Sequence, residues 1–236
     1  MQSLLKKNKK KNNIVLKDKF NPKYFPLLFN DRRYLIMMGG GGSGKSHFSA
    51  QKVLYEVLTN KIRVLVVRKT AKSLRQSTWA LLQRLIADYS LGNYFKTNKT
   101  EMTLKCNITG GEIIHAGLDD VNKLKSIDEI TMIWIEEATE IELEDFLQLD
   151  IRLRGKLPAN ANYQMILSFN PIDPSHWLRS HFYTDPTSET LEQAAFCHST
   201  IDDNELMDER PRQSQMRVLN AMKEIDETYY EVYRKG

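Results

Sequence analysis

An apolar run that leads directly into four consecutive glycines constrains this fold more than any other feature. Residues 34–51 read YLIMMGGGGSGKSHFSAQ. The mostly apolar stretch RYLIMM, residues 33–38, predicts a buried strand, and apolar residues recur at helical spacing from Ala50 to Leu58. Glycine is needed where the backbone turns with positive φ or approaches a ligand closely. The segment therefore predicts a strand and a helix joined by a loop of bare backbone, which suits a polyphosphate.

The loop matches the Walker A pattern in full, from Gly39 to Gly44, Lys45 and Ser46. In such loops the backbone N–H groups surround the phosphates, the lysine reaches the β- and γ-phosphates, and the hydroxyl binds Mg²⁺. The alternative is a glycine-rich turn with a chance Gly-Lys-Ser. We therefore expect ATP and Mg²⁺ as cofactors, with Lys45 as a catalytic residue and Ser46 as a metal ligand. The predicted nucleotide-binding residues of the loop are Gly39, Gly40, Gly41, Gly42, Ser43, Gly44, Lys45 and Ser46.

Strands and helices alternate along the rest of the chain. Further strands are predicted at 62–67, 131–138, 163–171 and 194–200, and a hairpin at 101–117. Helices are predicted around 79–89, over 143–155 with Gly155 closing the helix, and over 212–234. This alternation predicts an α/β P-loop NTPase fold with a mainly parallel central sheet covered by helices on both faces.

Two glutamates, Glu136 and Glu137, end a buried strand about 90 residues after the glycine loop. Ligands of open α/β sheets bind at the carboxyl ends of the strands, where these two glutamates lie. Glu136 fits the Walker B role of holding Mg²⁺, and Glu137 is placed to polarise a water for attack on the γ-phosphate. The alternative is an acidic helix N-terminus stabilised by the helix dipole. A strand between the two motifs in sequence and a glutamate after the second are typical of the RecA-like, ASCE branch of P-loop ATPases.

Asn170 follows the next strand, in LSFNP. If that strand neighbours the glycine-loop strand, the Asn170 amide lies beside the γ-phosphate and can sense its loss. The alternative is a simple Asn-Pro turn.

The charge of the chain is concentrated at its start. Five of the 34 basic residues fall in the first 11 positions, which leaves 29 basic against 30 acidic residues. We expect residues 1–19 to be a basic flexible tail, and the global charge gives no argument for nucleic acid. Two distant cysteines indicate a reduced cytosolic protein, and no apolar run approaches the ~18 residues of a membrane span.

The ordered motifs GGGGSGKS, VLVVRKTAKSLRQS, GLDDVNKLKS, WIEEATEI and LSFNP together resemble the ATPase domain of tailed-phage terminase large subunits. The resemblance implies ATP hydrolysis that drives double-stranded DNA into a prohead in the host cell cytoplasm. It also implies as partners the portal protein and the terminase small subunit, with a monomer in isolation and a homo-oligomeric ring on the portal. We expect the ATPase domain at 20–210, and at 211–236 a helical segment leading to a linker and a DNA endonuclease domain absent from this sequence.

One position departs from the family pattern, which usually reads GGRGSGKS. Gly41 stands where that arginine would contact the γ-phosphate. The resemblance favours a basic residue just before Walker B, donated by a neighbouring subunit, so Lys125 is the leading replacement and a predicted catalytic residue, together with Asn170. Lys123 and Lys125 are also placed to grip DNA. The other candidate cations are Arg68, Arg75, Arg152 and Arg154.

An aromatic segment precedes the first strand, where the family binds adenine. Tyr24 or Phe25 is predicted to stack on the base, and the alternative is packing on the sheet edge.

Three other classes of function remain open on the sequence. A helicase- or recombination-type DNA-dependent ATPase shares both Walker elements. A small-molecule kinase has no use for a water-activating glutamate, which disfavours it. A nucleotide-regulated DNA-binding protein would bind ATP without hydrolysing it.

Overall fold

One mixed sheet forms the centre of the molecule in the computed structural model, which describes residues 19–120, 124, 126–159, 161–171 and 173–236. Its strand order is β3-β4-β5-β2-β6-β7-β1-β8. The strands from β5 to β8 pair in parallel, and β3 and β4 add an antiparallel edge. The strands are β1 (Tyr34–Gly39), β2 (Arg63–Arg68), β3 (Phe95–Asn98), β4 (Thr103–Cys106), β5 (Glu112–Gly117), β6 (Met132–Glu136), β7 (Gln164–Phe169) and β8 (Ala194–Ser199).

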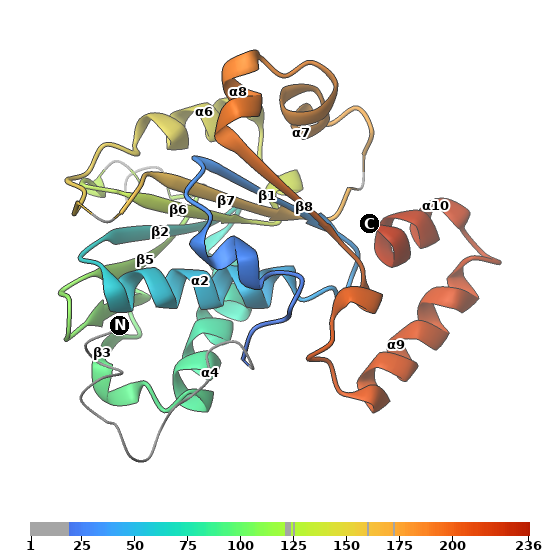
Figure 1. Ribbon diagram of the computed structural model, residues 1–236, viewed down its shortest axis with the longest axis horizontal. Helices are drawn as coiled ribbons and strands as arrows, with labels where there is room; N and C mark the ends of the chain where they lie inside the picture. The colour runs from blue at the N-terminus through green and yellow to red at the C-terminus, as the bar shows by residue number, and fades with distance from the viewer. Residues whose placement is uncertain (1–18, 121–123, 125, 160, 172) are drawn as a thin grey trace.

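Helices cover both faces of this sheet, as predicted. The α-helices are α2 (Lys45–Thr59), α3 (Ala71–Leu74), α4 (Ala80–Asp88), α6 (Leu143–Ile151), α7 (Trp177–Arg179), α8 (Ser188–Gln193), α9 (Glu209–Met222) and α10 (Glu227–Tyr230). Short 3₁₀ and π segments are η2 (Phe25–Phe29), η3 (Arg75–Trp79), η4 (Gly92–Tyr94), η5 (Ala138–Glu140), η6 (Ser180–Thr184), η7 (Ile201–Asp203) and η8 (Glu231–Lys235). In Figure 1, α2 and α4 lie below the sheet, and α6, α7 and α8 lie above it.

The central strands are apolar along most of their length because helices cover both faces of the sheet. Side chains of a strand alternate between its faces, so a strand buried on both faces needs apolar residues at every position. In β1, Leu35 and Met37 pack into the core under α2 and α4, whereas Ile36 packs into the core under α6 and α7. The sheet is therefore fixed in register by two separate cores.

The strand order brings three predicted motifs to one edge. β7 lies between β1 and β6, so the strand that separates the two Walker strands in space is β7, not the 62–67 strand that separates them in sequence. Met38 pairs with Phe169, and Glu136 pairs with Ser168. Because the strands are parallel, the glycine loop, Asn170 and Glu137 all begin at the same end of the sheet.

The predicted helix over 143–155 ends early, at Ile151. Gly155 does not cap it: a Cβ on Gly155 would lie 2.2 Å from the Glu129 carbonyl oxygen, so close chain approach explains this glycine. The hairpin at 101–117 is confirmed as β4 and β5, and β3 joins it as a further strand that the sequence analysis missed.

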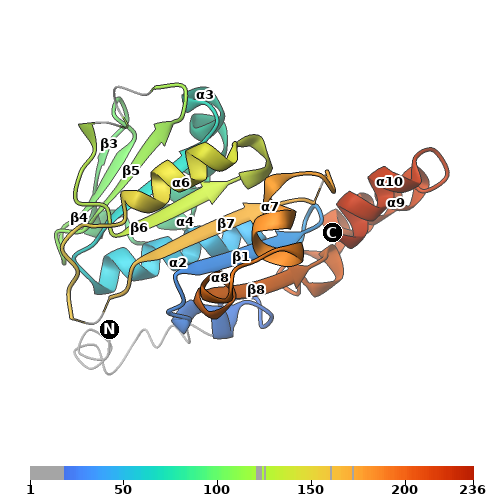
Figure 2. The same cartoon turned by 90° about the horizontal axis from the view of Figure 1, so that it is seen from above.

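The C-terminal part is broken rather than one helix. α9 and α10 lie to one side of the sheet in Figure 2, and the expected boundary at 210/211 falls inside α9. The chain then returns to the sheet edge, where His198 Nε2 donates to the Gly236 carbonyl at 2.8 Å. Residues 1–18 of the predicted basic tail lie outside the described residues. Among the described residues, every helix is too short or too polar to span a lipid bilayer.

Candidate nucleotide-binding site

The glycine loop connects β1 to α2 and turns through two left-handed glycines. Gly42 has φ +75° and Gly44 has φ +89°, and α2 begins at Lys45 directly after them. Residues with a Cβ rarely adopt this left-handed backbone conformation, so glycine is needed at both positions. The loop and the start of α2 together present backbone N–H groups and a helix dipole, which is the arrangement that binds phosphate.

The Lys45 side chain is enclosed by the loop and β7. Only 7% of Lys45 is exposed, and its Nζ donates to the Gly40 carbonyl at 3.1 Å and to Asn170 Oδ1 at 2.5 Å. Burial lowers the pKa of Lys45, and the charges of Glu137 and Glu136 oppose this shift. The structure thus brings Lys45, Asn170 and both glutamates to one place.

The Glu136 carboxylate is buried among hydroxyl groups. Ser168 donates to Glu136 Oε2 and accepts a hydrogen bond of 2.9 Å from Trp134 Nε1. Burial raises the pKa of Glu136, and hydrogen bonds from Ser168 and Ser46 act against this rise. A hydroxyl and a carboxylate side by side are hard oxygen ligands, so Ser46 and Glu136 fit Mg²⁺.

A site of this kind needs few protein ligands. Among the described residues, no group of three or more His, Cys, Asp or Glu side chains could hold a metal ion. Mg²⁺ commonly takes one or two protein ligands and completes its shell with substrate phosphates and water. The pair formed by Ser46 and Glu136 is sufficient for that mode.

Glu137 stands at the end of β6 in a left-handed conformation, with φ 53° and ψ 58°. Its side chain is half-buried, so it neither enters the core nor extends fully into solvent. The Glu137 charge acts on Lys45 and also raises the pKa of Tyr233, although burial of Tyr233 is the larger cause. Glu137 is therefore close enough to the glycine loop for its charge to act on Lys45.

The two aromatic residues predicted to stack on a base lie differently. Tyr24 is fully buried and stacks on Phe48, with ring centroids 5.1 Å apart and planes at 17°. Tyr24 has no exposed ring face for a base in this structure, so the alternative of packing at the sheet edge describes it better. Phe25 is half-buried and contacts Phe20 and Phe29 edge-on, and its stacking role stays a prediction.

Two of the candidate cations are already engaged near the strand ends. Arg68 Nη2 lies 2.5 Å from Glu140 Oε1, with its side chain 17% exposed. Arg75 is exposed and donates to the Lys99 carbonyl at 3.2 Å.

The remaining candidates lie elsewhere or are not described. Arg152 Nη1 donates to the Leu124 carbonyl at 3.0 Å, and Arg154 is exposed near the start of β6. Lys123 and Lys125 lie outside the described residues. The cation that compensates for Gly41 therefore stays a prediction.

Sequence reasoning missed several residues that contact the site. Ser168 could have been found, because it is a polar residue in an apolar strand, two positions before Asn170 and on the same face. No local signal identified Asn204, whose Nδ2 donates to the Gly42 carbonyl at 2.8 Å. Nor did any signal identify Tyr233, whose carbonyl accepts from the Gly41 N–H at 2.8 Å.

Comparisons with known proteins identify the family of this chain. A family model described as phage terminase large subunit matches residues 31–236. The PBSX phage terminase large subunit of Bacillus subtilis (strain 168) is 32% identical over 239 residues, covering 94% of this chain and 53% of the relative. The terminase large subunit of Bacillus phage SPP1 is 30% identical over 168 residues, covering 67% of this chain and 40% of the relative. The chain thus spans about half the length of the curated relatives it matches, or less.

Solved structures share the fold at lower identity. The large terminase of a thermophilic bacteriophage matches with a TM-score of 0.73 and 18% identity, over 92% of this chain and 53% of the other. That terminase has also been solved in complex with ADP and with ATP-γ-S. The family match over residues 31–236 and the 32% identical relative establish that this chain belongs to the phage terminase large subunit family.

Proposed function

We propose that this chain binds ATP with Mg²⁺ at the glycine loop and hydrolyses it to drive double-stranded DNA into a viral prohead. The observation that carries the proposal is the meeting of Lys45, Glu136, Glu137 and Asn170 at the ends of three neighbouring strands. The complexes of the thermophilic phage terminase with ADP and ATP-γ-S, together with family membership, support ATP as the nucleotide.

Lys45 and the loop amides bind the phosphates in this proposal. An ammonium group has three donors. Within the described part of the chain, Gly40 and Asn170 accept two of them, which leaves one for a phosphate oxygen. Because Asn170 shares Lys45 with the substrate, a change at the γ-phosphate alters the Lys45–Asn170 contact and reaches β7 directly.

The two glutamates have separate roles because their surroundings differ. Glu136 is buried and held by Ser168 and Ser46, so it is fixed in place as a Mg²⁺ ligand with Ser46. Mg²⁺, when bound, neutralises phosphate charge and orients the phosphate oxygens. Glu137 is half-buried, and no described residue holds its carboxylate in this way, so it can orient a water and accept its proton during attack on the γ-phosphate.

Gly41 leaves the loop without the arginine that the family usually carries at this position. An arginine finger increases phosphoryl transfer by about 10³–10⁵-fold where it acts. We therefore propose that a neighbouring subunit supplies the missing charge in a ring on the portal protein, with Lys125 as the leading donor. DNA, the portal and the terminase small subunit are the proposed partners.

The test is ADP and ATP binding, followed by phosphate release, across a wide range of protein concentration with and without double-stranded DNA. Lys45→Ala should lose nucleotide binding, and Lys61→Ala is the matched control outside the loop. Phosphate found on an acceptor molecule would favour a kinase. Stimulation by single-stranded rather than double-stranded DNA would favour the helicase- or recombination-type alternative.

A further inference from the structure

Two neighbouring carbonyls of the glycine loop are held from outside the loop by side chains. Asn204 Nδ2 donates to the Gly42 carbonyl at 2.8 Å, and the Tyr24 hydroxyl lies 2.9 Å from the Ser43 carbonyl. The Tyr24 oxygen is also 2.7 Å from Ser199 Oγ. A phenol has one proton and a carbonyl can only accept, so Tyr24 donates to Ser43 and Ser199 donates to Tyr24.

These contacts fix the direction of the next two amides. In a planar trans peptide, the C=O of one residue and the N–H of the next point in opposite directions, and no described peptide is cis. A Gly42 carbonyl held by Asn204 therefore directs the Ser43 N–H away from Asn204. In the same way, a Ser43 carbonyl held by Tyr24 directs the Gly44 N–H away from Tyr24.

We propose that Tyr24 and Asn204 are positioning residues that preset the Ser43 and Gly44 amides of the glycine loop for a nucleoside diphosphate or triphosphate. The inference rests on the proposed nucleotide binding, and it gives Tyr24 a role through its hydroxyl instead of base stacking. Neither side chain touches the substrate in this arrangement; each acts through a loop carbonyl.

The loop needs such support because of its composition. Glycine loses more conformational freedom on ordering than any other residue, and Gly42 and Gly44 flank Ser43 on both sides. A Cβ on Gly44 would meet the Asn204 side chain at 3.3 Å, so the bare backbone also admits the Asn204 amide. A loop with its peptides already oriented binds phosphate without the cost of ordering them.

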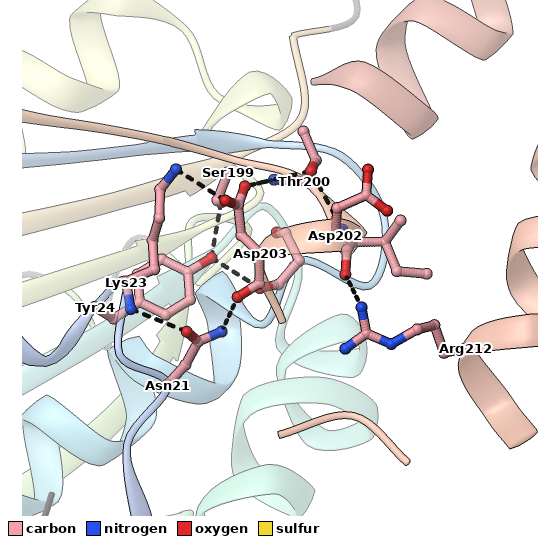
Figure 3. A network of polar contacts seen from close by, with 10 residues as sticks. Asn21, Lys23, Tyr24, Ser199, Thr200, Asp202, Asp203 and Arg212 are labelled. Carbon is pink, nitrogen blue, oxygen red and sulfur yellow. Dashed lines mark hydrogen bonds and ion pairs between the residues drawn. The ribbon is translucent and has the colours of Figure 1, made fainter. Parts of the chain in front are cut away.

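The segments that carry Tyr24 and Asn204 are tied together by polar contacts, and Figure 3 draws those around Tyr24, Asp203 and Arg212. The Asn21 side chain donates to the Asp203 carbonyl at 2.6 Å, and Lys23 Nζ lies 3.1 Å from Asp203 Oδ1. Arg212 of α9 donates to the Ile201 carbonyl at 3.1 Å and to the Asn204 carbonyl.

The Tyr24 ring is fixed in the core under α2 by its stacking on Phe48. Burial raises the pKa of Tyr24 to about 12, so its hydroxyl keeps the proton that it donates.

The test uses variants that remove one donor and keep the shape of the side chain. Tyr24→Phe keeps the ring on Phe48, and Asn204→Asp replaces the donor with an oxygen that repels the Gly42 carbonyl. One net hydrogen bond corresponds to about two- to tenfold in affinity. We expect Tyr24→Phe to weaken binding of a fluorescent ADP derivative by about that factor, and Asn204→Asp to weaken it more than Asn204→Ala.

Matched controls lose the same kind of bond elsewhere. The Tyr163 hydroxyl donates to the Gly155 carbonyl at 2.6 Å, and Asn107 Nδ2 donates to the Asn93 carbonyl at 3.2 Å. Tyr163→Phe should change the melting temperature as Tyr24→Phe does, and Asn107→Ala as Asn204→Ala does. Both control variants should bind the ADP derivative with the dissociation constant of the parent.

Each outcome decides the matter. If Tyr24→Phe and Asn204→Asp both bind the ADP derivative as the parent does, the inference is overturned and the proposed nucleotide binding is left intact. The same holds if the control variants lose as much affinity as these two variants do. A parental protein that binds the ADP derivative no better than Lys45→Ala would overturn nucleotide binding itself, and the inference with it. If Tyr24→Phe does not fold, Asn204→Asp decides alone.

Discussion

The left-handed backbone at Glu137 predicts an inverted preference between glycine and alanine. Glu137 has φ 53° and ψ 58°, and this conformation costs a residue with a Cβ about 1–2 kcal/mol. At an ordinary helical position, glycine is instead less stable than alanine by about 0.5–1 kcal/mol. Glu137→Gly should therefore be at least as stable as Glu137→Ala, although both remove the carboxylate.

The assay is thermal unfolding of two pairs of variants. Gln148 is exposed in the middle of α6 and has no left-handed backbone, so Gln148→Ala and Gln148→Gly form the control pair. At each site, the free energy of unfolding of the alanine variant is subtracted from that of the glycine variant. This difference should favour glycine more at residue 137 than at residue 148, by the left-handed penalty of about 1–2 kcal/mol. For a chain of this size that is about 2–8 °C in melting temperature. An equal difference at both sites would refute the backbone geometry on which the orientation of Glu137 depends.

Other predictions concern the surroundings of the site. Burial raises the pKa of Glu136, so the folded state binds the proton of this carboxyl more tightly than the unfolded state does. The buried charge therefore lowers the stability of the fold above the raised pKa. This cost is absent in acid, because Glu136 is then protonated in both states. Glu136→Gln should therefore raise the melting temperature at pH 8 by about 2–4 °C, which corresponds to a gain of about 1 kcal/mol in the free energy of unfolding. This gain should disappear as the pH falls toward 4. A melting temperature below that of the parent at every pH would contradict the prediction. Ser168→Ala leaves buried Trp134 Nε1 without its acceptor and should cost about 1–3 kcal/mol in denaturant unfolding, whereas a cost near zero would mean that this bond is not formed. Gly155→Ala forces a Cβ against the Glu129 carbonyl and should cost about 1–3 kcal/mol by the same measurement, and a neutral result would contradict the close approach.

The parts of the site that could be predicted from the sequence are those set by short-range pattern. The spacing of Gly44, Lys45 and Ser46 after an apolar strand needs no distant contact to be recognised. Glu137 and Asn170 were found because each directly follows an apolar strand, and ends of parallel strands share one edge of the sheet. The contact between Asn170 and Lys45 agrees with that argument.

The parts that could not be predicted depend on partners far along the chain. The Tyr24 hydroxyl meets Ser199, 175 residues later, so its burial is invisible in the segment that contains it. Asn204 reaches Gly42 only because the turn after β8 lies beside the glycine loop. Gly155 looked like a helix cap because the local pattern does not include the Glu129 carbonyl that packs against it.

The central claim is that Glu137 activates water for attack on ATP bound at the glycine loop. The most direct measurement is phosphate release by the parent and by Glu137→Gln at high protein concentration with double-stranded DNA, with ATP affinity measured in parallel. We predict that Glu137→Gln binds ATP as the parent does and releases no phosphate. Release at the parental rate by Glu137→Gln, or no release by a parent that binds ATP, would contradict the account.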